Sequence, residues 1–273
     1  ALRSKPLLKA FASILSKLQA GKLPPAQAYV ALRWTTAVLL RLELPAGAKA
    51  VDTLMKSQQQ LLETVQNSQY KSHIWLPILQ PLLDRGGMRA KYLSLVCSKD
   101  SKADTGVVAV VVHHCASRPE LMKEHGTALL QAFCDKVVMA REPVAEATIS
   151  AWRPLLCSLS NEEVGETLLP KVYLALKRTP DAALGALGPT LAALPVDLSP
   201  YTAEVVAALI PQLRHTRKEN RAQAAAVMGT LARGLKEASA FDSAYCALED
   251  ILSGKAGPKI KAAAERGGVV AGL

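Results

Sequence analysis

We predict an all-α fold, a right-handed superhelical solenoid of antiparallel helix pairs, from three observations on the sequence. Apolar residues recur at steps of three and four along most of the chain, which is the period of an amphipathic helix. The pattern repeats after about forty residues, the length of a HEAT or armadillo helix pair. Half of the 273 residues are apolar and only 4% are aromatic, and this Ala, Leu and Val composition suits closely packed helices.

The clearest repeat unit spans residues 201–235. Two segments, 201–213 and 218–235, each carry one apolar helical face and flank a basic turn, so they predict an antiparallel helical hairpin. A step of forty residues forward takes Tyr201 to Phe241. The same step backward takes apolar positions of the second helix onto Leu184, Leu187 and Leu191. One hairpin cannot bury its own apolar face, whereas a stack of hairpins can.

The repeat divides the chain into two parts of one continuous solenoid. Residues 119–273 carry the forty-residue period, which is faint at 121–160 and strong after it. Residues 1–118 are predicted to form divergent N-terminal helical repeats. The chain starts without methionine and stops within a helix-like pattern, so we expect a solenoid truncated at its C-terminal end.

The first hundred residues are expected to contain five helices, which are 4–19, 26–44, 51–65, 74–85 and 88–97. Gly21 ends the first of them. The second is apolar nearly all round, so we interpret Trp34 as a packing residue. Residues 106–115, GVVAVVVHHC, contain five valines, which locally favour a strand. We still predict a helix there, because an isolated strand in a helical stack would leave two unpaired edges.

Eight further helices follow, at about 119–138, 143–157, 161–178, 181–194, 200–214, 218–236, 240–253 and 257–273. The third of these starts with a capping box, in which Ser160 precedes Glu163 by three positions. Ser199 is predicted to be the N-cap of the helix at 200–214, with Pro200 as its first residue.

The net charge of +10 suggests an acidic partner such as nucleic acid, a ribosome or an acidic protein tail. Residues 1–150 contain 19 basic and 11 acidic residues, whereas 151–273 contain 14 and 12. The alternative is a mildly basic protein that binds no nucleic acid. Five scattered cysteines without C-x-x-C spacing indicate a reduced, intracellular protein without a metal knuckle. No apolar run is long enough for a membrane span, so we expect no membrane partner.

The sequence contains no pattern that predicts catalysis. Phosphate-binding loops, G-x-S-x-G elbows and H-E-x-x-H motifs are absent from it. His113, His114 and Cys115 resemble a metal cluster, but adjacent residues on a helix point about 100° apart and no further ligand lies four positions on. We therefore predict no catalytic residue, no cofactor and no metal, and a protein that is not an enzyme.

One set of residues is a candidate binding site. In a stack of helix pairs, the turns inside successive pairs align along one edge, and three successive turns here are basic. We call this set the basic ridge, and it consists of Lys177, Arg178, Arg214, Arg217, Lys218, Lys255 and Lys259. Arg221 and Lys261, at the start of the second helices, are expected to be partly structural. The alternative is a solvated edge without a ligand.

Two segments carry a resemblance to a known family. Residues 168–206 and 251–273 resemble the N-terminal HEAT-repeat region of the general-control translational activator family. The most specific pieces are VDLSPY at 196–201 and ILSGK at 251–255, and residues 31–45 are similar to an early helix of that family. Members are very large, ribosome-bound activators of the kinase that phosphorylates initiation factor two alpha.

The resemblance implies a non-catalytic, cytoplasmic scaffold arm of a translational regulator. Family members associate with stalled or collided ribosomes and promote activation of the kinase in amino-acid starvation. The expected partner of this arm is the ribosome, through ribosomal RNA or ribosomal protein, and other pathway proteins bind other regions. No family motif marks contact residues. The alternatives are an importin-like transport receptor, which would show an acidic inner surface, and a protein-assembly scaffold of the phosphatase type.

Overall fold

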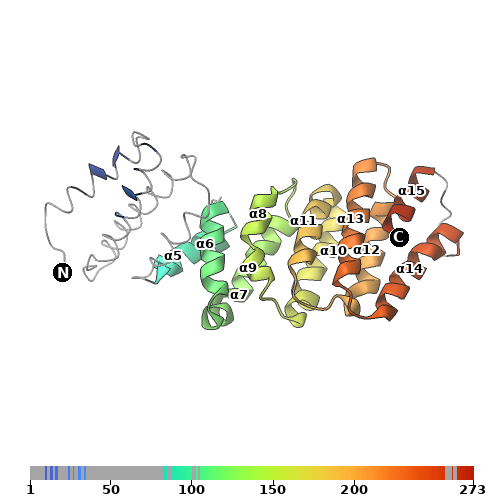
Figure 1. The fold of residues 1–273 in the computed structure, drawn as a ribbon, viewed down its shortest axis with the longest axis horizontal. Coiled ribbons are helices and arrows are strands. Elements are labelled where there is room, and N and C mark those ends of the chain that lie inside the picture. The colour runs from blue at the N-terminus through green and yellow to red at the C-terminus, as the bar shows by residue number, and fades with distance from the viewer. Residues whose placement is uncertain are drawn as a thin grey trace. The chain divides into compact units, whose positions relative to one another are not determined.

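The computed structural model describes residues 88–99, 105–255 and 263–273, together with scattered positions before residue 104 and Ile260. The chain divides into two compact units between His114 and Cys115. All regular elements of the described residues are helices, which confirms the all-α prediction (Figure 1). The helices expected at 4–19, 26–44, 51–65 and 74–85 lie almost entirely outside the described residues. The arrangement of 1–118 and 119–273 as one solenoid stays a prediction.

The valine-rich segment is helical. It forms α6 (Thr105–Ala116), which follows α5 (Met88–Cys97). Five valines of α6 are between 0 and 5% exposed, and they are Val107, Val108, Val110, Val111 and Val112. Burial of these valines stabilises the helix. This stabilisation outweighs the local preference of valine for β-strands.

The second unit consists of four helix pairs. The first pair contains α7 (Pro119–Phe133) with its π-helical end η2 (Cys134–Val138), then α8 (Glu146–Ala151) and α9 (Arg153–Leu156). The second contains η3 (Glu163–Leu168), α10 (Leu169–Arg178) and α11 (Pro180–Ala193). The third contains η4 (Ser199–Tyr201), α12 (Thr202–Leu213) and α13 (Lys218–Gly234). The fourth contains α14 (Ala238–Ser253) and α15 (Ala263–Gly272).

These pairs stack as two layers. Helices α10, α12 and α14 lie side by side in one layer, and α11, α13 and α15 form the other (Figure 1). Each first helix also contacts the second helix of its own pair. The turns inside the pairs therefore lie along one edge, and the connections between pairs lie along the opposite edge. This is the architecture of an α-solenoid.

The helix predicted at 143–157 begins at Glu146 and is interrupted at Trp152, which separates α8 from α9. Pro154 explains the break, because it has no N–H to donate to the carbonyl group four positions earlier. The indole of Trp152 is 1% exposed, and its centroid lies 5.8 Å from that of the Phe133 ring in an edge-to-face arrangement. At this interruption the Trp152 side chain, the largest buried one of the pair, points into the core.

The predicted capping box is present. The backbone N–H of Ser160 donates to Glu163 Oε2 at 2.9 Å, and the N–H of Glu163 donates to Ser160 Oγ at 3.3 Å. These reciprocal bonds satisfy donors at the start of the helix that no helical carbonyl reaches. The sequence did not predict the π-helical turn of η3 that follows.

The repeat period is visible in the hydrogen bonds between pairs. Tyr201 Oη donates to the carbonyl oxygen of Asn161, forty residues earlier, at 2.8 Å. A Cβ on Gly165 would lie 2.9 Å from the Tyr201 ring, so glycine is needed for this close approach. On the second helices, Asn220 Nδ2 donates to Asp181 Oδ1, 39 residues earlier, at 2.6 Å. Equivalent positions of successive pairs are therefore joined directly.

Ser199 is not the N-cap that the sequence predicts, because no side-chain bond caps η4 or α12. Its hydroxyl oxygen accepts the backbone N–H groups of Lys236 and Glu237, both at 3.0 Å, and donates to Asp197 Oδ1 at 2.7 Å. The local sequence suggests a cap, but the hydroxyl instead accepts from the N–H groups that precede α14. Ser199 thus fastens the third pair to the start of the fourth.

Replacing Ser199 by alanine is expected to lower the free energy of unfolding by about 1–3 kcal/mol, because the half-buried N–H of Glu237 loses its hydroxyl acceptor, while the N–H of Lys236 keeps Asp197 Oδ1 at 3.2 Å. Urea unfolding followed by circular dichroism measures this loss. Ser243→Ala, at an exposed position of α14, is the control and should change stability by less than about 0.5 kcal/mol. Equal losses for both variants would contradict the role given to Ser199.

The Ser199 bonds also predict a pH dependence. The N–H and O–H groups of Ser199, followed by the N–H and charge of Lys236, lower the pKa of Asp197 below its ordinary value. A folded pKa below the unfolded one stabilises the protein above the unfolded pKa of about 4, and this contribution is lost as the pH falls below it. The stability difference between wild type and Ser199→Ala should therefore shrink in acid.

Candidate basic interface

The turns inside the helix pairs lie next to one another at one edge of the stack, as the two layers require. The turn between α10 and α11 is Thr179, that between α12 and α13 is 214–217, and that between α14 and α15 spans 254–262. The residues of the basic ridge lie in these turns or at the helix ends beside them. Lys259 lies outside the described residues.

Three cations of the basic ridge are exposed and belong to no ion pair among the described residues. Lys177 and Arg178 end α10, where positive charge is favourable beside the free carbonyl groups of the helix. Lys218 is the first residue of α13 and follows the turn inside the next helix pair. Lys255 is 75% exposed, and its Nζ lies 3.9 Å from Asp250 Oδ1, which is a loose contact. These side chains are available to an external anion.

Arg214 has a structural contact. Its side chain is 17% exposed, and Nη2 lies 3.2 Å from Glu265 Oε2 of α15. Arg221, also expected to be partly structural, closes the same turn, since its Nη1 donates to the carbonyl oxygens of His215 at 2.8 Å and Thr216 at 2.7 Å. Gly268 packs so closely here that a Cβ would collide with the Leu213 carbonyl oxygen and the Arg221 side chain.

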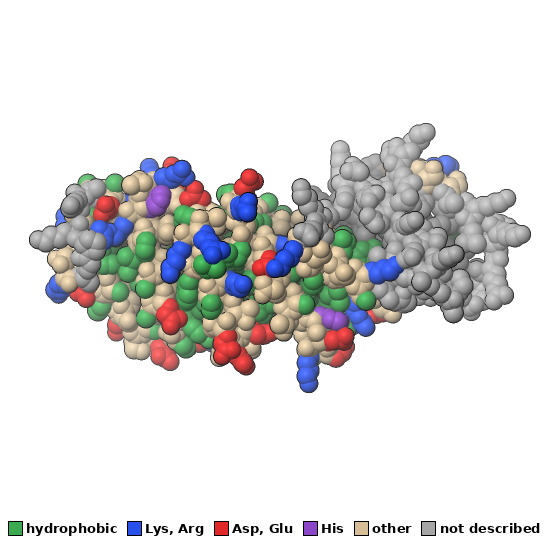
Figure 2. Space-filling view, turned by 180° about the vertical axis from the view of Figure 1, so that it is seen from behind, with side chains coloured by type: hydrophobic (Ala, Val, Ile, Leu, Met, Phe, Trp, Pro, Cys, Tyr) green, Lys and Arg blue, Asp and Glu red, His purple; other side chains and the backbone are tan. Residues whose placement is uncertain are grey.

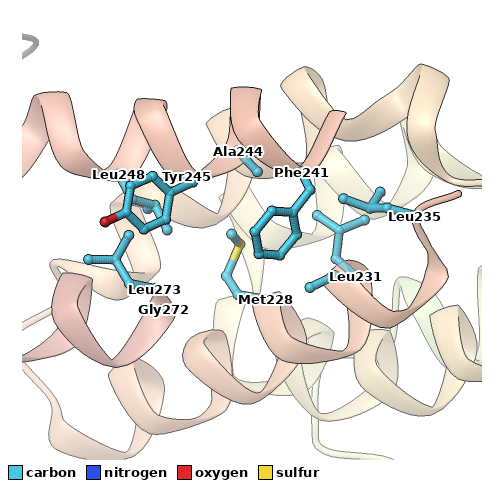
Figure 3. A pocket seen from close by; sticks show the side chains of 10 residues that line it. Met228, Leu231, Leu235, Phe241, Ala244, Tyr245, Leu248, Gly272 and Leu273 are labelled. Atoms are coloured by element: carbon cyan, nitrogen blue, oxygen red, sulfur yellow. The ribbon is translucent and has the colours of Figure 1, made fainter. Parts of the chain in front are cut away.

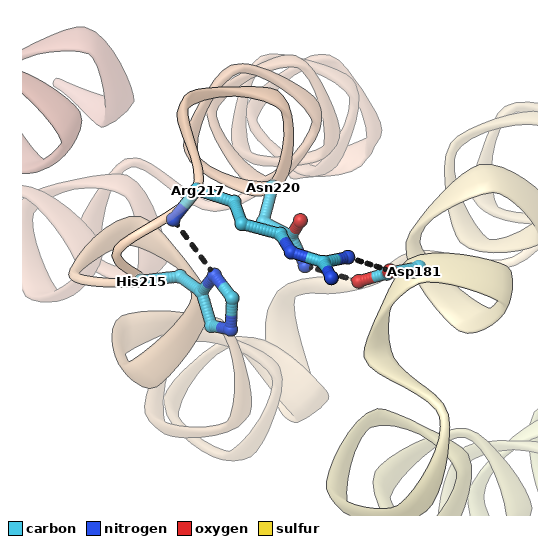
Figure 4. Close-up of polar contacts among 4 residues, drawn as sticks. All are labelled: Asp181, His215, Arg217 and Asn220. Atoms are coloured by element: carbon cyan, nitrogen blue, oxygen red, sulfur yellow. Dashed lines mark hydrogen bonds and ion pairs between the residues drawn. The ribbon is translucent and has the colours of Figure 1, made fainter.

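Arg217 belongs to a cluster that we call the Asp181 cluster, which contains Asp181, Arg217 and Asn220 (Figure 4). Arg217 Nη1 lies 2.7 Å from Asp181 Oδ2, and Asn220 Nδ2 donates to Oδ1 at 2.6 Å. The backbone N–H of Arg217 donates to His215 Nδ1 at 3.1 Å. The sequence did not predict this cluster. A signal for it was the position of Asp181 in the first turn of α11, one repeat before Arg217.

Charge is unevenly distributed on the surface of the second unit. Figure 2 shows Lys and Arg side chains along the middle of one face, while most Asp and Glu side chains on that face lie near its lower margin. Local separation of charge matters here because residues 151–273 carry nearly equal numbers of basic and acidic groups. Any attraction of anions must come from this arrangement and not from net charge.

His113, His114 and Cys115, which the sequence predicts not to bind a metal ion, lie on α6. The side chains of His114 and Cys115 are 0% exposed, and His114 Nε2 lies 3.4 Å from Asp84 Oδ1. Among the described residues no group of three His, Cys, Asp or Glu side chains is placed to hold a metal ion. Within the same residues, no helix has the length and hydropathy needed to span a bilayer.

An apolar recess lies between α13 and α14 near the end of α15. Met228, Leu231, Leu235, Phe241 and Tyr245 project into it from the two facing helices (Figure 3). The aromatic side chains are 48% and 45% exposed, whereas Leu231 is 1% exposed. The buried face of α13 therefore continues into this recess.

Together, the stacked pairs and their exposed cations define an α-solenoid repeat protein with a basic edge. Comparison with known sequences adds a match at the level of a family: residues 126–259 match the family model described as the N-terminal region of the stalled ribosome sensor GCN1. The resemblance to the general-control translational activator is thereby confirmed.

Individual relatives agree with this assignment. The stalled ribosome sensor GCN1 of Homo sapiens is 26% identical over 256 residues, which are 90% of this chain and 10% of the relative. The Mus musculus protein of the same name is 25% identical over the same shares. Protein ILITYHIA of Arabidopsis thaliana is 26% identical over 151 residues, 55% of this chain and 6% of the relative. The chain spans about a tenth of the length of the first of these relatives. No solved structure matches it significantly.

Proposed function

We propose that this chain is a non-catalytic scaffold arm of a cytoplasmic translational regulator and that it associates with ribosomes through the basic ridge. Similarity to the human and mouse proteins, which are named stalled ribosome sensors, supports a ribosome as the partner. The observation that carries the proposal is the exposure of Lys177, Arg178 and Lys218, without ion pairs among the described residues, on two successive turns.

The spacing of these turns suits a nucleic-acid backbone. Packed helices lie about 8–10 Å apart, so successive turns offer positive charge at short, regular intervals. An RNA strand presents phosphates at shorter regular intervals, so one lies within reach of each turn, and each neutralised phosphate releases condensed counterions. Ribosomal RNA is therefore the anionic component of the ribosome that we assign to this edge, with ribosomal protein as the alternative contact.

Members of the basic ridge have different roles in this proposal. Lys177, Arg178 and Lys218 contact the partner, and Lys255 and Lys259 extend the contact to the fourth pair. Arg214 supports the turn through Glu265. Arg217 takes part only when it leaves Asp181.

The finer part of the proposal concerns signalling. By the family resemblance, ribosome association by this arm supports activation of the initiation-factor-two alpha kinase in amino-acid starvation. Other proteins of that pathway bind other regions of the much longer relatives. A rigid stack without a catalytic centre among the described residues suits an arm that positions other parts.

Co-sedimentation of the purified chain with purified ribosomes over a salt series tests the proposal. Three to five phosphate contacts predict that the logarithm of the binding constant falls against the logarithm of salt with a slope of about −2 to −4.5. Binding that does not change with salt would indicate apolar protein contacts instead of the ridge. No co-sedimentation at low salt would refute ribosome association by this chain.

A further inference from the structure

The guanidinium of Arg217 makes one ion pair among the described residues, and this pair is accessible to solvent. The side chains of Arg217 and Asp181 are 64% and 49% exposed, and the contact uses only Nη1. An exposed pair of this kind contributes little to stability, because water and salt screen it. Arg217 and Asp181 also border an open recess lined by Gly185, Asn220 and Gln223 among others, which leaves room for another group beside them.

A phosphate is a better partner for this guanidinium than the carboxylate in its present geometry. Guanidinium groups bind phosphate through two parallel N–H donors, whereas Asp181 receives one. The neighbouring Lys218 is exposed and belongs to no ion pair among the described residues, so it offers a second positive charge to a phosphate. A phosphodiester chain on the basic ridge therefore competes with Asp181 for Arg217.

Asp181 keeps partners when Arg217 leaves. Asn220, which is 3% exposed, donates its Nδ2–H to Oδ1 at 2.6 Å and holds the carboxylate between α11 and α13. Asp181 is also the second residue of α11, where free backbone N–H groups favour a negative charge. Release of Arg217 thus leaves no buried or unpaired carboxylate.

We propose that Asp181 is a built-in competitor that restrains Arg217 while the basic ridge is empty and releases it to an RNA phosphate on binding. The competition lowers the affinity of the ridge for RNA and makes it depend on one exchangeable ion pair. This inference rests on the proposed function, since it concerns the same edge of the stack. The competition between Asp181 and a phosphate for Arg217 can be tested with RNA alone.

The test measures binding of the full chain to a short fluorescent RNA hairpin by anisotropy, and to purified ribosomes by co-sedimentation. Asp181→Asn should tighten RNA binding about two- to fivefold at low salt, because it frees Arg217. The new amide oxygen still accepts from Asn220, so the fold is retained. In the Arg217→Gln background, Asp181→Asn should give no gain, because the released group is missing.

Asp242→Asn is the matched control, since it makes the same charge change at an exposed position near the start of α14, by the opposite edge. The inference is overturned if Asp242→Asn tightens binding as much, if the gain persists with Arg217→Gln, or if the hairpin does not bind. An Arg217-dependent gain with RNA but no binding to ribosomes would uphold the competitor and refute the proposed function. Ribosome binding without such a gain would do the reverse.

Discussion

Replacing Leu231 by aspartate is expected to lower the free energy of unfolding by about 4 kcal/mol or more, which is enough to unfold part of the stack. Leu231 is 1% exposed on α13, the middle helix of its layer, between α11 and α15. Figure 3 shows its side chain directed toward Phe241. An aspartate there would bury a charge beside apolar groups, and no cation is among the described residues that line this recess.

The loss should start in the last two pairs. Repeat stacks are stabilised mainly by contacts between neighbouring repeats, so α13 failing to pack removes support from α12 and α15 in these pairs and from α11 in the pair before them. Thermal unfolding followed by circular dichroism should show a lower midpoint and reduced helical signal before the transition. Hydrogen exchange should show the earliest loss of protection in these helices.

Ala226→Asp on the exposed face of α13 is the matched control. It introduces the same side chain into the same helix and should cost less than about 1 kcal/mol, the helix-propensity difference. If Leu231→Asp unfolded like wild type, or if Ala226→Asp were equally harmful, the faces assigned to α13 would be wrong.

The sequence predicts the buried face of α13 and the repeat because both depend on a local period. Leu231 and Val205 are buried where the spacing of three and four places them. The capping box at Ser160 is predictable for the same reason, because its two partners lie three positions apart. The helical state of α6 required one further argument, that an unpaired strand cannot be accommodated in a helical stack.

Contacts between pairs are much less predictable. Arg214 binds Glu265, 51 residues later, although the repeat suggests a partner near forty. Ser199 has the local signature of an N-cap, yet its hydroxyl serves N–H groups 37 and 38 residues away. Arg217 was assigned to a ligand, whereas Asp181 of the preceding pair already contacts it. In each case the side chain has several possible partners, and only the three-dimensional stacking selects one.

Reversing two unpaired cations of the basic ridge, Arg178→Glu together with Lys218→Glu, should weaken ribosome binding on the order of ten- to a hundredfold near 0.1 M salt. Each lost phosphate contact removes about one unit from the salt slope. Arg178 ends α10 and Lys218 begins α13, so the helix-dipole penalty at the first site is offset at the second. Stability should therefore change little, which thermal unfolding verifies.

The matched control is Lys123→Glu with Arg153→Glu, which reverses one lysine and one arginine at exposed positions of the first pair. Lys123 lies near the start of α7 and Arg153 comes after α8, so both are away from the turn inside that pair. Charge attraction by the molecule as a whole would make the two double variants equally weak. A contact by the ridge makes only Arg178→Glu with Lys218→Glu weak, because screening limits the influence of each charge to about 10 Å at this salt concentration. If neither variant lost affinity, the ribosome contact would lie on another surface of the chain.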